Sequence, residues 1–312
     1  MHARGMLVLL AAVGGCSWSS SAARVEQSQA SLKALGTLHD FEIARLANAT
    51  QLTELEGLHE LDPVNPELLS QLVRAWVTET ELFTSDDLEA AIEREDSSAR
   101  LYHSERVRSG FARASFWGRE WLSVRADDVN LDADRAELAE TLKREFDAKQ
   151  DAEPLLWLGH ALLGAAGLGT GEFGAGEGDA RTRRAAQLVL EQSIALDESV
   201  RFATAHVLVA RAYALTIPAD FDKSRQHFDR AEALAGNELL LTRFYHATAY
   251  HCRHGDQAEF QLLLNQVLKT SDPEPSVRLE NATAKRRAQR WTLSPALVRS
   301  CAFKSDDSVV AQ

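Results

Sequence analysis

The chain has 312 residues and a formal net charge of -12, with 45% hydrophobic and 26% charged residues. This composition is typical of a packed globular body and excludes an intrinsically disordered chain. The acidic balance disfavours nucleic acid as a partner, because binding to phosphates requires an excess of Lys and Arg.

The N-terminal residues have the pattern of an export signal. Arg4 precedes an apolar run over residues 6–13, and small residues follow that run. About 20 apolar residues are needed to cross a bilayer, so the run is too short for a membrane helix. The pattern predicts a signal peptide over residues 1–15.

Cys16 follows this signal directly. The residues Val13-Gly14-Gly15-Cys16 resemble the lipobox of bacterial lipoproteins, in which the cysteine is acylated and becomes the mature N-terminus. We therefore expect Cys16 to be lipidated, residues 16–22 to form a flexible tether, and the body to lie in the periplasm at a membrane surface. An aspartate directly after the lipidated cysteine favours retention in the inner membrane. Ser17 occupies that position here, which favours the outer membrane. An ordinary signal peptide cleaved near Ala22 is the alternative.

The body, over residues 23–300, is expected to be a single all-α domain with N-terminal helices in 23–150. Strong helix formers dominate its composition, and the alternating β-branched residues of strands are almost absent. Asn65 and Pro66 predict the start of one helix, and Ser85 is predicted to cap another. Apolar spacing predicts further helices near residues 23–60, 99–124 and 133–146. The apolar positions assigned to helix interiors include Ile43, Leu46, Tyr102, Phe111, Phe116, Trp117 and Trp121.

A glycine-rich segment separates a helix bearing Trp157 from one that begins near Arg181. Gly169, Gly171 and Gly174 form a G-x-G-x-x-G pattern. A helix precedes the pattern where a dinucleotide site requires a strand, and acidic residues within the segment would repel phosphate. We therefore expect a flexible loop between helices and no nucleotide site.

The sequence after this loop repeats itself. Three segments align on Leu190, Phe228 and Leu262, at separations of 38 and 34 residues. A period near 34 with helix-turn-helix units is typical of tetratricopeptide repeats, in which each helix pair must stack on a neighbour to bury its apolar face. Residues 151–295 are therefore expected to form an α-solenoid, a tetratricopeptide-like array of helical hairpins.

Five helical segments carry residues that can be compared with a known family. The last of them has the form R-L-x-N-x-x-A-x-x-R-A. In this chain that form includes Asn281, Arg287 and Ala288. The segments are residues 155–169, 186–199, 203–215, 222–237 and 275–293. In them the chain resembles the T-component (TatT) family of TRAP transporters, which are periplasmic lipoproteins. The resemblance implies helical hairpins, an apolar channel or cavity in each protomer, assembly as a homotrimer, and binding to the solute-binding P subunit.

Alignment of the repeats places several aromatic and histidine side chains toward a concave face or cavity. Aromatic side chains suit apolar ligands because they offer a large contact area with few rotatable bonds. Ordinary helix packing is the alternative for each of them. The candidate binding residues are Trp157, His160, His206, Tyr213, Tyr245 and Tyr250.

Two other clusters invite functional interpretations. His246, His251, Cys252 and His254 crowd one segment, but no pair has the i, i+4 spacing of a helical zinc site, so roles at the surface or the core edge are expected rather than a metal site. The basic residues of 285–291 spread around a helix, and solvated faces and ion pairs are expected there.

No catalytic motif brings together a nucleophile, a base and an orienting group, so neither enzyme activity nor a cofactor is expected. Cys252 and Cys301 allow one disulfide, which the sequence leaves open. Residues 301–312 are expected to be a disordered tail. The alternative function is a tetratricopeptide lipoprotein that acts as a scaffold in cell-envelope assembly without a small ligand.

Overall fold

The computed structural model describes residues 21–170, 177–272 and 274–303. All regular structure in these residues is helical, which confirms the all-α prediction. Cys16, Gly171 and Gly174 lie outside the described residues.

The helices fall into an N-terminal and a C-terminal set, joined by short turns and a few 3₁₀ segments. The N-terminal set is α1 (Ser21–Gly36), α2 (Phe41–His59), α3 (Pro66–Thr78), α4 (Ser85–Glu93), α5 (Ser97–Arg125) and α6 (Arg135–Glu145). The C-terminal set is α7 (Ala152–Ala165), α8 (Glu177–Leu196), α9 (Val200–Leu215), α10 (Phe221–Ala235), α11 (Leu240–Tyr245), α12 (Cys252–His254), α13 (Gln257–Lys269), α14 (Arg278–Leu293) and α15 (Pro295–Val298).

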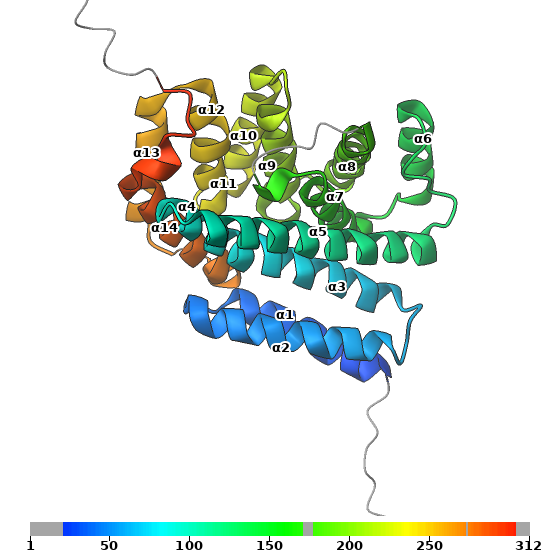
Figure 1. Ribbon diagram of the computed structural model, residues 1–312. Helices are drawn as coiled ribbons and strands as arrows, with labels where there is room; N and C mark the ends of the chain where they lie inside the picture. The colour runs from blue at the N-terminus through cyan, green and yellow to red at the C-terminus, as the bar shows by residue number, and fades with distance from the viewer. Residues whose placement is uncertain (1–20, 171–176, 273, 304–312) are drawn as a thin grey trace, which may run out of the picture.

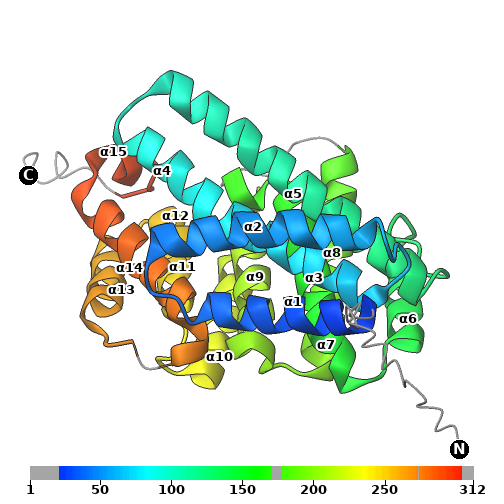
Figure 2. The ribbon, with the colours of Figure 1, turned by 90° about the horizontal axis from the view of Figure 1, so that it is seen from below.

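Long helices form one side of the molecule, and shorter hairpins stand on them. α1 and α2 lie side by side beneath α3 and α5, and the later hairpins project from the other side of α5 (Figure 1). Seen from below, α1 begins at the end that carries α6, whereas α15 lies at the opposite end (Figure 2). The hairpins α7–α8 and α9–α10 pack closely, as expected for helical pairs.

Local capping chemistry explains several helix starts. Asn65 accepts a hydrogen bond from the backbone N–H of Leu68, and Pro66 occupies the first turn of α3, as predicted. Asp40 caps α2 in the same way and divides the region 23–60 into two helices. Ser85 is not a cap, because the chain runs on in helical conformation from α3 to α4.

Two π-helical turns interrupt otherwise continuous helices. The first, Glu79–Thr84, joins α3 to α4, and the backbone N–H of Ser85 bonds to the carbonyl of Thr80, five residues earlier. The second, His246–His251, joins α11 to α12, and Cys252 bonds to Ala247 in the same way. Such turns hold one extra residue and occur often at functional sites.

Of the three positions that the repeat alignment matches, two are buried and one is exposed. Leu190 and Phe228 are fully buried, but Leu262 is 48% exposed and Leu264 takes the inward position instead. The buried side chains of α13 are Phe260, Leu263, Leu264 and Val267, so the aligned position falls on the outer side of this helix.

Four other apolar residues assigned to helix interiors lie at the surface instead. Ile43 and Leu46 lie on the outer side of α2, while Tyr102 and Phe116 lie on the outer side of α5. Each helix has one buried stripe, and these residues fall outside it.

Two apolar cores fill the molecule. The N-terminal core draws on α1 to α9, and the C-terminal core draws mainly on α9 to α15 together with Phe41, Leu82 and Phe83. Across residues 21–303, apart from the gaps stated above, no helix combines the length and the apolar character that crossing a bilayer would require.

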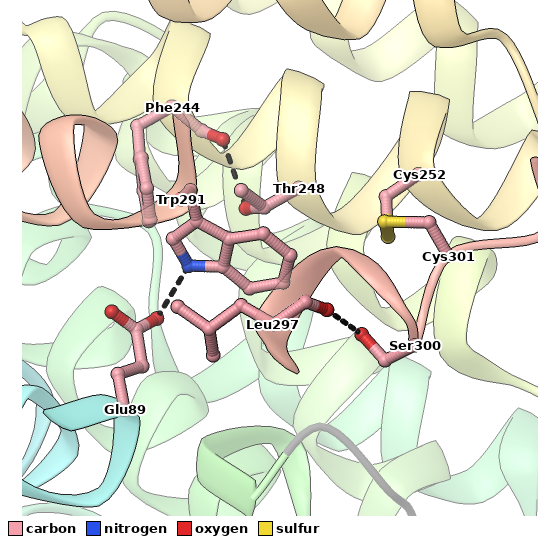
Figure 3. Close-up of a disulfide and its surroundings, with 8 residues drawn as sticks. All are labelled: Glu89, Phe244, Thr248, Cys252, Trp291, Leu297, Ser300 and Cys301. Carbon is pink, nitrogen blue, oxygen red and sulfur yellow. Dashed lines mark hydrogen bonds between the residues drawn. A yellow bond between two sulfur atoms is a disulfide. The ribbon is translucent and has the colours of Figure 1, made fainter. Parts of the chain in front are cut away.

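A disulfide between Cys252 and Cys301 fastens the C-terminal end, and Figure 3 shows it beside Trp291 and Leu297. The backbone N–H of Ala302 also bonds to the carbonyl of Cys252, and the ring of Phe303 packs against Phe260. The ordered chain thus extends at least to Phe303, past the boundary expected at residue 300.

Candidate functional site

A cavity of about 60 Å³ lies where the two apolar cores meet. Val77, Trp157 and Leu208 of the N-terminal core line it, together with Leu82 and Val207 of the C-terminal core. Its polar lining residues are Thr78, Glu81, His160, Arg201, Thr204, Arg211, Thr242, Tyr245 and Glu280.

Glu81 is the central acidic group of this cavity. It lies in the first π turn and is 4% exposed. Its Oε1 accepts hydrogen bonds from Arg211 Nη1, at 2.9 Å, and from the hydroxyl of Tyr245. Its Oε2 lies 3.5 Å from Nε2 of His160, which is too far for a good hydrogen bond.

Tyr245 links Glu81 to a second ion pair. Its hydroxyl accepts a hydrogen bond from Arg287 Nη1 at 2.9 Å, and Arg287 holds both carboxylate oxygens of Glu89, at 2.7 and 3.1 Å. We call Glu81, Glu89, Arg211, Tyr245 and Arg287 the ionic layer. It joins α3–α4, α9, α11 and α14 through charge-assisted hydrogen bonds.

A second pocket, of about 310 Å³, lies on the other side of the ionic layer. Arg211 and Tyr245 line both this pocket and the cavity, so they stand between the two. The second pocket also borders the disulfide end, where the indole N–H of Trp291 donates to Glu89 (Figure 3).

The ionic layer keeps its charges fixed. Burial opposes ionisation of Glu81, but the charges of Arg211 and Arg287 and the contact with His160 outweigh it and hold the pKa of that carboxyl well below its usual range. Burial raises the pKa of the Tyr245 hydroxyl, which therefore stays protonated and can donate to Glu81. Burial disfavours the charged form of Arg287, yet Glu89 more than compensates and raises its pKa.

The backbone beside the cavity is strained. Arg201, Phe202 and Ala203, in the first turn of α9, have φ values of 46°, 58° and 59°. The left-handed conformation costs about 1–2 kcal/mol for each residue with a side chain. An ion pair of 2.8 Å between Arg201 and Glu280 crosses to α14 and helps to hold this turn. Strain of this kind concentrates at functional sites.

Three of the six residues predicted for the binding site line the cavity, namely Trp157, His160 and Tyr245. The ring of Trp157 stacks on His160, and its indole N–H donates to Glu153. The repeat alignment therefore found part of this wall.

The other three predicted residues lie in two separate groups. His206 and Tyr213 contact His227, and the Nδ1 atoms of the two histidines are 2.9 Å apart. Tyr250 packs with His246, His251 and His254. We call these the first histidine group (His206, Tyr213, His227) and the second histidine group (His246, Tyr250, His251, His254).

The two residues of the C-terminal motif have different tasks. Asn281 accepts a hydrogen bond from the backbone N–H of Leu240 and donates to the carbonyl of Glu238, so it fastens the start of α11. Arg287 belongs to the ionic layer. The neighbouring Arg286 and Arg290 pair with Asp86, so ion pairs do form in the basic segment, as expected, although Arg290 is buried rather than solvated.

Sequence reasoning missed Glu81, Arg211 and Thr242. Arg211 did leave a signal, because it is the only charged residue in the otherwise apolar stretch 202–215. Glu81 left none, since its partners lie far away in the chain.

The groups around the cavity fit the binding of a small molecule. Cys252 is held in the disulfide, and within the described part of the chain no set of three or more His, Cys, Asp or Glu side chains is placed to hold a metal ion. The cavity offers apolar walls around a few fixed polar groups, which is the usual composition of a small-molecule site.

A family model described as TRAP transporter T-component matches residues 38–294. The match covers all the residues of the ionic layer and of the cavity wall. No curated protein compared with the chain matches it.

Proposed function

The chain belongs to the family of TRAP transporter T-components, and on this premise we propose that it is the lipid-anchored periplasmic T component of a TRAP transport system. In this role it binds the solute-binding P subunit and holds an apolar part of the solute in the cavity beside Glu81. The matched family is one of transporter components, and we propose no catalytic step.

The cavity at the junction of the two cores is the observation that supports binding of a solute. Its apolar walls come mainly from α3 and the π turn after it, α7, α9 and α11, and it ends at the ionic layer. Larger side chains could close such a space and stabilise the fold, so side chains that leave a cavity here favour a use for it. A scaffold lipoprotein without a ligand, the alternative function, has no need of it.

The position of α1 supports attachment through Cys16. Four residues separate Cys16 from Ser21, where α1 begins, so the five steps of chain between them reach at most about 18 Å. Lipid on Cys16 would therefore hold the end of the body that carries α6 close to the membrane. The opposite end, with α15 and the disulfide, would face away from it (Figure 2).

A groove between α2 and α5 is the proposed surface for the P subunit. Its volume is about 790 Å³, and Ala49, Thr53 and Tyr102 contribute to its lining. Leu46, one turn before Ala49 on α2, is 71% exposed, and Tyr102 is 62% exposed. Large apolar side chains exposed beside a groove are typical of protein interaction sites.

Native mass spectrometry of the detergent-extracted chain, mixed with its candidate P subunit, tests this function. We expect a mass increase from acylation that Cys16→Ser removes, a complex with the P subunit, and a stoichiometry that reports whether the chain is trimeric. Leu46→Glu should weaken the complex at least about tenfold, which corresponds to 1.4 kcal/mol. Leu61→Glu is the matched control, because Leu61 is about as exposed as Leu46 but lies beyond the C-terminal end of α2, whereas Leu46 lies one helical turn from Ala49 of the groove. Absence of any complex with the wild-type chain would overturn the proposal.

A further inference from the structure

The charged side chains of the cavity wall are already paired with one another. Arg211 pairs with Glu81 at 2.9 Å, and Arg201 pairs with Glu280 at 2.8 Å. Each pair contributes one positive and one negative charge, so the wall carries no net charge. A ligand that brought its own charge would have no opposite charge left to meet, and an unpaired buried charge is strongly unfavourable.

Several polar atoms of the same wall nevertheless have no hydrogen-bond partner within the described residues. One is the Oε2 atom of Glu280, whose side chain is partly buried. The other five belong to four more deeply buried side chains, and they are the Oγ1 atom of Thr242, the Nε atom of Arg211, the Oε2 atom of Glu81 and both ring nitrogens of His160. All four side chains are at least nine-tenths buried. A buried polar atom without a partner costs about 1–3 kcal/mol, so a ligand or water that satisfied these atoms would stabilise the protein.

The unpaired atoms include both donors and acceptors. The Nε atom of Arg211 can only donate, and the carboxylate oxygen of Glu81 can only accept, while the hydroxyl of Thr242 can do both. A carboxylate head would meet Glu81 with like charge, and an ammonium head would find no use for the Arg211 donor. A hydroxyl or amide group both donates and accepts, and it carries no charge.

We propose that this cavity binds the uncharged, hydrogen-bonding end of an aliphatic ligand, such as an alcohol or an amide, among Glu81, His160, Arg211 and Thr242. This inference rests on the proposed function and specifies the chemical class of the solute. The cavity is partly open, and Val77, Leu82 and Leu208 line it together with these polar groups. The polar end of the ligand therefore meets the polar atoms, and the aliphatic part lies along those three apolar side chains.

Three six-carbon probes that differ only in the head group test this inference. The full lipidated chain in lipid nanodiscs is titrated with 1-hexanol, hexanoate and hexylammonium. Binding is followed by ligand-observed saturation-transfer NMR, and empty nanodiscs supply the background. We expect 1-hexanol to bind at least about tenfold more tightly than either ion, since an unpaired buried charge costs more than 1.4 kcal/mol.

Threonine variants show whether the binding occurs in this cavity. Thr242→Val keeps the shape of the side chain and removes the hydroxyl, so it should weaken 1-hexanol binding about threefold to tenfold. Thr242→Ser keeps the hydroxyl and should retain binding. Thr283→Val is the matched control, because Thr283 is equally buried but donates to the carbonyl of Leu279, away from the cavity.

The outcomes separate this inference from the proposed function. If hexanoate or hexylammonium binds as tightly as 1-hexanol, the proposal that the cavity selects an uncharged head group is wrong. If no probe binds while the complex with the P subunit forms, the cavity holds water only and the inference fails, but the T-component function stands. If 1-hexanol binds in a Thr242-dependent manner without any P-subunit complex, the inference stands and the partner proposal fails.

Discussion

The ionic layer and the two histidine groups share the helices α9 and α11 or the residues next to them, yet they hold their charges in opposite ways. In the ionic layer, Glu81 and Arg287 stay ionised because each meets an opposite charge. In the histidine groups, burial and the neighbouring imidazoles lower the pKa of His227 and His251 to about 4, so both rings stay neutral at neutral pH. Paired burial thus preserves charge, whereas burial without a strong opposite charge removes it.

Removing one partner from the ionic layer is the strongest test of this difference between the two regions. Arg287→Met should leave Glu89 buried without its bidentate partner and destabilise the fold by about 3–5 kcal/mol, measured by urea unfolding. Arg286→Met is the control, since Arg286 also pairs with a carboxylate but is 44% exposed, and it should cost about 1 kcal/mol or less. Equal losses for the two variants would show that the layer is not a special source of stability.

The disulfide links the second histidine group to the C-terminal end of the described chain, and its contribution to stability can be measured by itself. Cys252 lies between His251 and His254 of this group, and its bond to Cys301 closes a loop of 49 residues. Cys301→Ser should lower the free energy of unfolding by about 2–4 kcal/mol, because the unfolded chain gains freedom. Urea unfolding with and without a reducing agent measures this, and reduction should affect only the wild-type chain. A wild-type chain insensitive to reduction would contradict the bond.

Two tyrosines five residues apart allow a smaller and cleaner comparison. The Tyr245 hydroxyl bonds to Glu81 and Arg287, whereas the Tyr250 hydroxyl has no hydrogen bond within the described residues. Tyr245→Phe should cost about 1.5–3 kcal/mol in urea unfolding, because it removes hydrogen bonds to charged groups. Tyr250→Phe should change stability by less than about 0.5 kcal/mol. If the two variants behave alike, the hydroxyl of Tyr245 does not join the two ion pairs.

As the pH falls, the side chains of the histidine groups should take up protons before the carboxylates of the ionic layer do. The pKa values of His227 and His251 are about 4 in the folded chain and about 6.5 when unfolded, so the unfolded state binds more protons between these values. Stability should therefore fall as the pH drops from 6.5 to 4, by about 1–2 kcal/mol in total given the partial exposure of both rings. Unfolding midpoints measured across this range test the sign. His227→Gln should flatten the dependence, and a stability that rises on acidification would contradict it.

Features set by neighbours in sequence were predictable, and features set across the fold were not. Asn65 and Pro66 mark the start of α3 through contacts within one turn. Ser85 was wrongly taken as a cap, because the π turn before it supplies its backbone hydrogen bond from within a continuous helix. The inward position of α13 was misplaced at Leu262, since three consecutive leucines satisfy the same pattern.

The candidate site shows the same division. Trp157, His160 and Tyr245 were found through their place in the repeats, and they do line one cavity. Glu81 was missed because its partner Arg211 lies 130 residues away. A sequence pattern within one helix carries no record of such a pairing, although a single arginine in an apolar stretch indicates that a buried acid must exist somewhere in the fold.

The π turn Glu79–Thr84 also sets the angular positions of the residues that follow it. Each residue advances an α-helix by about 100°, and the π turn takes up one extra residue, so the side chains after it lie about 100° from where an uninterrupted α-helix of the same sequence would place them. This offset lies between Glu81 and Glu89, and it helps to direct Glu89 toward the guanidinium of Arg287 while Glu81 faces Arg211. The extra residue between these two acids is thus as much a part of the layer as their carboxylates.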